Sequence, residues 1–309
     1  MAYTINMQEN EKMKLLFVIN PISGGKEKSD WEETIRTYFK SSPHDMEFYL
    51  LTGKSDNVSV AHHIETAKPH RVVAVGGDGT VKLLAEVVQN KNIPLAIIPA
   101  GSANGMATEL EIPNDVNEAL DIAVNGLEKN IDVIRINDEE ICIHLSDIGL
   151  NAMIVKYFEE TKKRGMWGYG KTIFKAMWQK QKMHVTIQTD AGTYKRKAYM
   201  VVLANARKYG TGGNINPHGD VADGLFEVVV LRRIHLFEII KSLFTDKSFH
   251  PNRIEVFHTK EAILTTLKKT YFQVDGEYRG KITELSAAIV PGALRMMLPD
   301  TKNKDEVLA

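Results

Sequence analysis

A glycine-rich stretch that begins at Val75 holds the residues of this chain best suited to phosphate chemistry. It reads Val-Gly-Gly-Asp-Gly-Thr over residues 75–80 and follows an apolar run. Glycines let the backbone turn sharply and approach an anion closely, and a helix beginning after them would offer free amides and a favourable dipole to a phosphate. The Asp78 carboxylate could hold a magnesium ion or orient a hydroxyl. The alternative is a tight strand–helix turn with an Asp cap, but the full string favours a phosphate site.

Strands and helices alternate in the first part of the chain, which predicts a parallel sheet with helices on both faces. Ligands of such sheets bind at the carboxyl ends of the strands. The glycine-containing turns after Asn20, Val75 and Pro99 all follow predicted strands, so we expect them to gather at one edge. The predicted strands are 15–19, 47–51, 72–75 and 95–98, and the predicted helices are 29–39, 56–67, 80–89, one opening at Pro99-Ala100-Gly101, and one capped by Asn114 and running through Val124.

The pattern changes after about residue 131, where short apolar runs linked by turns predict an antiparallel β-sandwich or barrel. We therefore expect an α/β domain at 1–132 and a β-rich domain at 133–309, whose last strand could return to the first domain. Helices are expected at 152–160, 171–180 and 236–244. The predicted strands are 133–136, 141–145, 185–189, 199–204, 225–230, 253–257, 262–266 and 272–274.

Composition narrows the classes of protein that the chain can belong to. Lys and Arg number 39 against 39 Asp and Glu, which argues against a dedicated nucleic-acid binder because such proteins carry a basic excess. No apolar run reaches the roughly 18–20 residues of a membrane-spanning helix, and the first residues do not read as a secretory signal. Cys142 is the single cysteine and cannot form an internal disulfide. These features predict a cytoplasmic protein.

Six motifs in order give the chain a specific resemblance. It resembles the diacylglycerol kinase catalytic-domain family, which includes bacterial lipid kinases and sphingosine or ceramide kinases. One of these motifs alone would be weak evidence, because NAD kinases share Gly-Gly-Asp-Gly-Thr. The motifs are Asn20-Pro21-Ile22-Ser23-Gly24, Gly76-Gly77-Asp78-Gly79-Thr80, Pro99-Ala100-Gly101-Ser102-Ala103-Asn104, Ile131-Asp132-Val133, Asp223-Gly224-Leu225-Phe226-Glu227-Val228 and Val274-Asp275-Gly276-Glu277.

The resemblance implies an ATP-dependent lipid kinase. It implies a Rossmann-like α/β domain, a β-sandwich domain and an ATP site in the cleft between them. Transfer of the γ-phosphate of ATP to a lipid hydroxyl would make the protein a transferase of phospholipid or sphingoid metabolism. Carried over by motif, the nucleotide contacts are Thr52, Gly76, Gly77, Asp78, Gly79, Thr80, Val81, Lys82 and Ser102, the last at the start of a helix.

The same resemblance assigns the catalytic and metal-binding residues. Glu277 would accept the proton of the lipid hydroxyl, and Asp78 is the second catalytic candidate. By its residues alone, the stretch 274–277 would be read as a hairpin turn, because Asp-Gly is favoured there. Asp132 and Lys26 are further candidates for metal, hydroxyl or phosphate contacts. The implied Mg²⁺ site, made of hard oxygen ligands, comprises Asp220, Asp223 and the backbone carbonyl of Leu225.

Three departures from the family pattern keep other functions open. Lys82 and Leu83 replace the usual Asn-Glu pair, and Gly105 stands where an acid is usual. The loss at Gly105 suggests a sphingoid-like subgroup or weakened catalysis. The alternatives are an NAD kinase-like enzyme and a non-catalytic nucleotide- or lipid-binding homologue.

A basic and aromatic stretch at 156–182 suggests how the protein could meet a lipid substrate. It contains eight basic and two acidic residues, interleaved with aromatic residues that include Trp167 and Trp178. Such a segment could lie on an anionic membrane surface, as a peripheral protein does, or could be a solvated helix with a core-facing aromatic stripe. A homodimer is compatible with the sequence, which carries no direct signal of oligomeric state.

Overall fold

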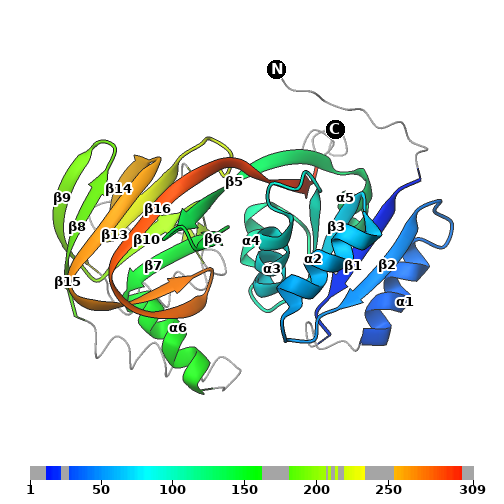
Figure 1. Cartoon of the computed structure of the whole chain (residues 1–309), viewed down its shortest axis with the longest axis horizontal. Helices are drawn as coiled ribbons and strands as arrows, with labels where there is room; N and C mark the ends of the chain where they lie inside the picture. The colour runs from blue at the N-terminus through cyan, green and yellow to red at the C-terminus, as the bar shows by residue number, and fades with distance from the viewer. Residues whose placement is uncertain are drawn as a thin grey trace, which may run out of the picture. The chain divides into compact units, whose positions relative to one another are not determined.

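A computed structural model describes residues 12–21, 28–161, 181–206, 208–209, 213–214, 219–233 and 254–300. The chain divides into two compact units (Figure 1). The first comprises the described residues up to Ser102, Glu111–Lys129 and those from Arg295 onward, and the second comprises Ala103–Leu110 and the described part of Asn130–Leu294. Among the described residues, no helix is long and apolar enough to cross a membrane.

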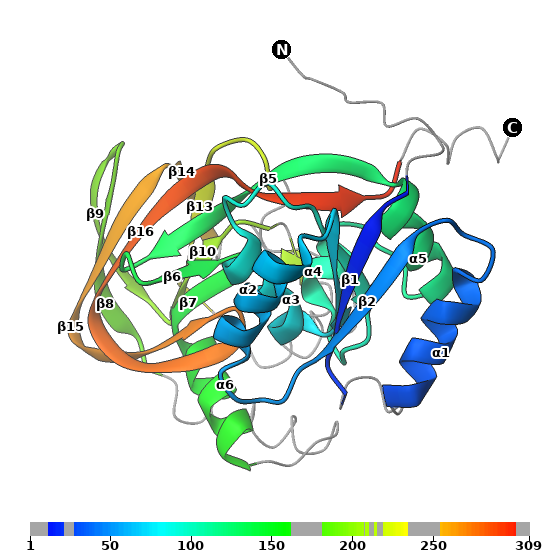
Figure 2. The same cartoon turned by 45° about the vertical axis from the view of Figure 1, so that its right-hand side comes forward.

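The first unit is built on a parallel sheet with strand order β4-β3-β1-β2. α2 packs on α3 and α1 packs on α5, so helices cover both faces (Figure 2). This confirms the predicted α/β architecture. The elements are β1 (Lys14–Ile19), α1 (Lys28–Tyr38), β2 (Asp45–Leu50), α2 (Asp56–Ala67), β3 (Arg71–Gly76), α3 (Asp78–Val88), β4 (Leu95–Pro99) and α5 (Val116–Asn125).

The central strands of this sheet are buried on both faces. Every residue of β3 and of β4 is buried, as expected for parallel strands between two helical layers. One predicted helix cap is wrong: Asp115, not Asn114, caps α5. Its carboxylate accepts the amides of Asn117 and Glu118 at 2.9 and 3.0 Å, the usual geometry of an N-cap.

The second unit is a mainly antiparallel β-sandwich, as predicted. Its strands follow the order β14-β13-β10-β7-β15-β16, with β8 and β9 continuing from β15. One set of buried side chains packs around Phe226 and Phe272, and a second packs between the sheet and α6. The elements are α4 (Gly105–Glu109), β5 (Leu127–Ile136), β6 (Glu140–Cys142), β7 (Leu145–Gly149), α6 (Leu150–Thr161), β8 (Met183–Thr189), β9 (Gly192–Ala198), β10 (Met200–Ala204), β11 (Lys208–Tyr209), β12 (Gly213–Asn214), β13 (Phe226–Leu231), β14 (Ile254–Thr259), β15 (Glu261–Val274) and β16 (Glu277–Leu298).

Several strand predictions in this unit need correction. The predicted strand 141–145 is interrupted at Ile143 and His144, whose amides bond to a carboxylate instead of a neighbouring strand. The predicted strands 262–266 and 272–274 belong to the single strand β15, which is irregular between them. β9 and most of β16 were not predicted, because polar residues alternate along them and Pro291 interrupts the pattern. The helices expected at 171–180 and 236–244 lie outside the described residues.

β16 contributes to both units. Its residues up to Leu294 belong to the second unit, and those from Arg295 belong to the first. Within the first unit, Met296 pairs in parallel with Leu95 of β4. The predicted boundary near residue 132 lies close to Asn130, where the chain enters the second unit. Two segments lie outside this simple division: Ala103–Leu110 belongs to the second unit, and the end of β16 belongs to the first.

Candidate functional site

The turn between β3 and α3 requires glycine at its first two positions. A Cβ on Gly76 would lie 2.3 Å from Oγ1 of Thr80, and a Cβ on Gly77 would lie 3.0 Å from the Cα of Gly101. The backbone is therefore packed too closely for side chains at these two positions. A Cβ on Gly79 would meet nothing within 4 Å, so the turn is open at that residue.

The residue at the N-cap position of α3 has no side chain that could cap the helix. Gly77 occupies the N-cap position, and its carbonyl oxygen accepts the amides of Thr80 and Val81 at 2.9 and 3.1 Å. The hydroxyl of Thr80 is buried and has no hydrogen-bond partner within the described residues. An uncapped helix start of this kind suits an anion, because amides and the helix dipole face it.

Two of the predicted nucleotide contacts have buried side chains. Val81 is 2% exposed and Lys82 is 4% exposed, so both side chains are buried within the fold. The sequence placed them at the nucleotide through the family motif alone. The open residues of the turn are Asp78 and Gly79, which are partly or fully exposed.

Neighbouring strands bring three other motif segments to the same edge of the sheet. Ile19 pairs with both Leu50 and Val75, and Gly76 pairs with Pro99. The four strands therefore end together, and the turns that follow Ile19, Leu50, Gly76 and Pro99 leave from one edge. This is the gathering that the sequence predicts. The rest of the first motif, from Ile22 to Gly24, and Lys26 lie outside the described residues.

Thr52 is held in place by the start of α2. Its amide and hydroxyl lie 3.0 and 2.9 Å from Oδ1 of Asp56, and the amide of Gly53 donates to Oδ2 at 2.7 Å. Burial raises the pKa of Asp56, but these hydrogen bonds outweigh it and leave the pKa below its usual range. Asp56 thus remains a carboxylate that fixes the backbone of Thr52 at the sheet edge.

Ser102 follows β4 at the same edge, but it does not open a helix. α4 begins only at Gly105, because Asn104 adopts a left-handed conformation with φ of 49° and interrupts the chain direction. The prediction that Ser102 lies at a helix N-terminus is therefore wrong. Ser102 is exposed, so its hydroxyl can still reach a ligand.

The Asp-Gly-Glu motif forms a two-residue hairpin turn in the second unit. Val274 pairs with Glu277, and Asp275 and Gly276 have φ values of 48° and 83°. Positive φ at both positions identifies the turn favoured by Asp-Gly. The hairpin that the residues alone predicted is present, and it places Glu277 at the first position of β16.

The Asp275 carboxylate fastens this turn to the segment between β6 and β7. Oδ1 accepts the amides of His144 and Leu145 at 2.9 and 3.2 Å, and Oδ2 accepts the amide of Ile143 at 3.1 Å. The amide of Asp275 in turn donates to the carbonyl of Leu145 at 2.9 Å. Charge-assisted bonds to several amides make this a firm attachment.

A buried amide and acid support the same turn from beneath. Oε1 of Gln273 accepts the amide of Gly276 at 2.7 Å, and its Nε2 donates to the buried carboxylate of Asp147. Asp147 also accepts the side chain of Asn151 and the amide of Ala152 at the start of α6. The turn is therefore connected to the core and to α6 through groups whose hydrogen bonds are satisfied.

Glu277 itself is exposed and ion-paired. Nη2 of Arg279 lies 2.7 Å from Oε2 of Glu277, and Nε of Arg279 lies 3.1 Å from both carboxylate oxygens of Glu140. Burial lowers the pKa of Arg279, but these two carboxylates raise it far above its usual range. Arg279 thus stays charged and limits where the carboxylate of Glu277 can point.

The predicted metal ligands lie in a loop before β13. Oδ1 of Asp220 accepts the amide of Ala222 at 3.1 Å, and Oδ1 of Asp223 accepts the amide of Leu225 at 2.9 Å. Both acids are exposed. Two carboxylates and a carbonyl are hard oxygen donors, which suits Mg²⁺, although no cluster of three acidic, His or Cys side chains occurs among the described residues.

Asp132 holds this loop and is not itself exposed. Its Oδ2 accepts the amide of Gly224 at 2.7 Å, its Oδ1 accepts the amide of Gly292 at 2.7 Å, and its side chain is buried. Both oxygens are thus used by the backbone. Asp132 therefore supports the loop from beneath, and its contact with a metal or hydroxyl stays a prediction.

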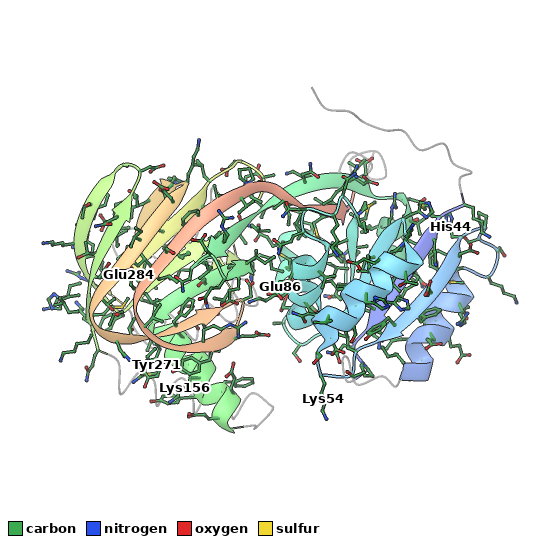
Figure 3. All side chains as sticks on the ribbon, in the orientation of Figure 1. His44, Lys54, Glu86, Lys156, Tyr271 and Glu284 are labelled. Atoms are coloured by element: carbon green, nitrogen blue, oxygen red, sulfur yellow. The ribbon has the colours of Figure 1, made fainter. Side chains whose placement is uncertain are left out.

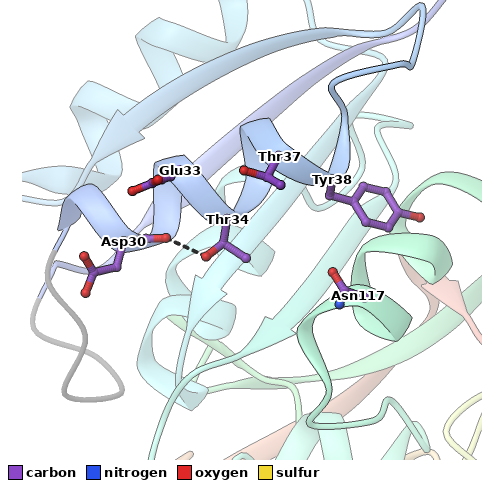
Figure 4. A pocket seen from close by; sticks show the side chains of 6 residues that line it. All are labelled: Asp30, Glu33, Thr34, Thr37, Tyr38 and Asn117. Atoms are coloured by element: carbon purple, nitrogen blue, oxygen red, sulfur yellow. Dashed lines mark hydrogen bonds between the residues drawn. The ribbon is translucent and has the colours of Figure 1, made fainter.

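A hollow of about 490 Å³ lies between α1 and α5 and contains none of the predicted site residues (Figure 4). Asp30 and Glu33 on its wall would repel a phosphate. We therefore do not assign it to the nucleotide. The lining residues are Asp30, Glu33, Thr34, Thr37, Tyr38 and Asn117.

Sequence reasoning missed the residues that hold the turns in place. Asp147, next to Ser146 in β7, and Gln273, between Phe272 and Val274 in β15, belong to none of the recognised motifs and gave no signal. Arg279 could have been noticed, since residues i and i+2 of a strand share a face, which places it beside Glu277.

The two parts of the chain match two different families of known domains. Residues 14–136 match the diacylglycerol kinase catalytic domain, and residues 146–298 match the YegS C-terminal NAD kinase beta sandwich-like domain. A "Probable lipid kinase YegS-like" of Klebsiella pneumoniae is 28% identical over 260 residues, which covers 82% of this chain and 86% of the relative. One of the same name from Cronobacter sakazakii is 26% identical over 263 residues, with coverages of 83% and 87%.

Solved structures show the same fold. A diacylglycerol kinase structure from Bacillus anthracis aligns with a TM-score of 0.73 at 18% identity, covering 94% of this chain and 98% of that one. An NAD kinase from Archaeoglobus fulgidus in complex with ATP aligns with a TM-score of 0.55 at 13% identity, covering 95% and 96%. The two domain matches together span most of the chain in the expected order: residues 14–136 belong to the diacylglycerol kinase catalytic-domain family, and residues 146–298 belong to the YegS C-terminal domain family.

Proposed function

We propose that this protein is an ATP-dependent lipid kinase that transfers the γ-phosphate of ATP to the hydroxyl of a diacylglycerol-like or sphingoid-like lipid. The observation that carries the proposal is the turn between β3 and α3. Its first two glycines are required by packing, its N-cap residue Gly77 offers no side-chain cap, and it is open at Gly79. A family relationship to lipid kinases supports the choice of substrate class.

The nucleotide phosphates are proposed to lie against the first turn of α3. The amides at the start of the helix and the helix dipole would stabilise their charge, and Asp78 is at the first position of the helix. Ser102 and Thr52 leave the same sheet edge and would contribute hydroxyls. Because Asp56 already engages Thr52, that hydroxyl is better suited to accept a hydrogen bond than to donate one.

Glu277 is proposed as the general base. Its carboxylate would take the proton of the lipid hydroxyl while the hydroxyl oxygen forms a bond to the γ-phosphorus. The bond between the γ-phosphorus and the oxygen bridging to the β-phosphate breaks, and ADP leaves. Asp275 and Gln273 fix the turn that presents Glu277, and Arg279 orients its side chain.

Asp220, Asp223 and the carbonyl of Leu225 are proposed to hold Mg²⁺. When bound, the ion would supply positive charge that orders the loop, with Asp132 fixing the loop from beneath. Removing divalent ions should therefore reduce both transfer and the thermal stability of the loop region.

The experiment follows labelled γ-phosphate from ATP into a mixed lipid extract with Mg²⁺ present. Wild type, Glu277→Gln and Glu284→Gln are compared, since Glu284 is an exposed acid on the same strand, β16. We expect a labelled lipid with wild type and Glu284→Gln, and a loss of about 10²–10⁴-fold with Glu277→Gln. The mass of the labelled lipid identifies the substrate.

Other outcomes would replace the proposal. Equal transfer by Glu277→Gln and wild type would exclude Glu277 as the base. Transfer of label to NAD but to no lipid would favour the NAD kinase-like alternative, whose fold the Archaeoglobus structure shares. ATP binding without transfer to either acceptor would favour a non-catalytic homologue.

A further inference from the structure

β15 carries an irregular segment that holds a leucine out of the fold. The pairing with β16 shifts between Thr265, which pairs with Glu284, and Thr270, which pairs with Ile282. The intervening residues therefore outnumber those opposite them, as in an extended β-bulge. We call residues 266–270 the β15 bulge.

The backbone of the bulge is fixed by a buried threonine. Thr266 is 6% exposed, and its hydroxyl lies 2.9 Å from the carbonyl oxygen of Lys268 and 3.3 Å from that of Thr283. Thr270 at the other end contacts the sulfur of Met183 at 3.7 Å. The residues between these two anchors are thus presented outward by the strand itself.

Leu267 is the most exposed of the large apolar side chains in the described part of the second unit, at 81%. Single exposed leucines are common on protein surfaces, so exposure alone carries no argument. This leucine, however, stands on an anchored bulge and is followed by Lys268 and Lys269, both exposed. Neither lysine forms an ion pair within the described residues.

More cationic and aromatic groups lie close to the bulge. Lys281 is two residues from Thr283 on β16, and its ammonium lies 4.3 Å from the ring centroid of Tyr271. The ammonium of Lys156, on α6, lies 5.5 Å from the centroid of the same ring. Figure 3 shows the side chains of Lys156 and Tyr271 together. Lys156 is also paired with Glu160 at 3.2 Å, whereas Lys268, Lys269 and Lys281 have no ion pair among the described residues.

We propose that the β15 bulge docks on an anionic lipid bilayer, with Leu267 entering the interface and Lys268, Lys269 and Lys281 facing lipid phosphates. An apolar tip surrounded by lysines and an aromatic ring complements such a surface, since the acyl region takes the leucine and the negative headgroups take the ammonium groups. A protein partner would need an acidic, concave surface, for which nothing in the structure gives a match. This inference rests on the proposed function, because a lipid kinase meets its substrate at a bilayer.

The test measures sedimentation with vesicles of equal parts phosphatidylglycerol and phosphatidylcholine. A lysine near an anionic surface contributes about 1 kcal/mol, so Lys268→Gln with Lys269→Gln should weaken binding about 30-fold. Leu267→Gln should weaken it about tenfold. Binding should fall at high salt and be weak on pure phosphatidylcholine.

Matched controls come from the first unit. Val58 is 74% exposed on α2, and Lys40 and Lys68 are exposed lysines without an ion pair among the described residues. Val58→Gln and the double change Lys40→Gln with Lys68→Gln should bind vesicles as wild type does. All variants should keep the wild-type melting temperature, because each alters an exposed side chain.

A second measurement reports on the leucine directly. Leu267→Cys, labelled with an environment-sensitive fluorophore, should shift to shorter wavelength on anionic vesicles, since the other cysteine, Cys142, is buried. A label at Val58→Cys should not shift. The absence of a shift at position 267 would overturn the insertion of this residue.

The inference and the proposed function fail in different ways. Wild-type binding by the bulge variants, equal loss by the control variants, or no wild-type binding to anionic vesicles would overturn the docking surface. Phosphate transfer to lipid in detergent micelles should be unchanged in the bulge variants, because micelles do not require docking on a bilayer. Loss of phosphate transfer in Glu277→Gln with vesicle binding intact would support both the proposed function and the docking surface.

Discussion

Replacing Asp275 should destabilise the second unit in proportion to the hydrogen bonds that each substitution removes. The carboxylate accepts three backbone amides, and a bond to a charged group contributes about 1.5 kcal/mol or more. Alanine removes all three and adds about 1 kcal/mol, because Asp275 has a positive φ of 48°. The expected cost of Asp275→Ala is about 5 kcal/mol.

Asparagine at position 275 separates the loss of hydrogen bonds from the cost of the positive φ. It keeps one acceptor oxygen, which can still serve His144 and Leu145, and it tolerates positive φ. Only the bond from the amide of Ile143 is lost, so Asp275→Asn should cost about 2 kcal/mol. A larger loss of stability in Asp275→Ala than in Asp275→Asn therefore tests the geometry of the turn and not only its presence.

Calorimetry provides the measurement. A unit of 150–250 residues loses about 2–4 °C of Tm per kcal/mol. We therefore expect Asp275→Ala to lower the melting temperature by about 10–20 °C and Asp275→Asn by about 4–8 °C. Phosphate transfer should fall with both, because the turn presents Glu277.

The control is a similar aspartate without this network. Asp138 occupies the β5–β6 turn with φ of 57°, and among the described residues its carboxylate pairs only with Arg135, in an exposed contact. Asp138→Ala should lower the melting temperature by about 2–4 °C from backbone strain alone. Equal shifts at positions 138 and 275 would refute the view that the Asp275 carboxylate fastens the turn.

Three further perturbations follow from the same kind of contact. Gly76→Ala should reduce ATP binding at least tenfold in a fluorescence titration and lower stability, because its Cβ would lie 2.3 Å from the Thr80 hydroxyl; wild-type ATP affinity would contradict this. Asp132→Asn should weaken Mg²⁺-dependent stabilisation in a thermal shift assay, since one of its two amide bonds is lost; an unchanged response to Mg²⁺ would disprove the support role. Hydrogen bonding to Arg196 lowers the pKa of Glu255 below 4.5, so this pair stabilises the fold above that pH and loses its effect as the pH falls through the lowered pKa. The difference in urea midpoint between wild type and Glu255→Gln should therefore shrink between pH 7 and pH 3, and a constant difference would refute the assignment.

Much of the first unit could be predicted because its signals are local. Buried parallel strands appear as short apolar runs, and the helices between them carry a clear period. The position of Ser102 could not be read in the same way. Whether a helix starts at residue 102 or 105 depends on the left-handed conformation of Asn104, which no apolar pattern records.

The second unit was harder to predict because its signals depend on distant residues. The strand expected over 141–145 is interrupted by a carboxylate more than a hundred positions away. The first part of β16 belongs to the second unit and its end belongs to the first, so its polar and apolar positions are set by two different environments. The Asp-Gly hairpin, by contrast, could be predicted, since its turn type is set by its own two residues.

The structure accounts for the first two residues of the Asp-Gly-Glu motif but not for the third. Asp275 fastens the turn and Gly276 adopts its positive φ. The side chain of Glu277 is exposed and, among the described residues, pairs only with Arg279. An exposed ion pair contributes at most about 1 kcal/mol, so Glu277→Gln should lower the melting temperature by no more than about 4 °C. Its transfer activity should nevertheless be lost. A large loss of stability in Glu277→Gln would mean that the carboxylate is part of the fold, and its role as base would then need other evidence.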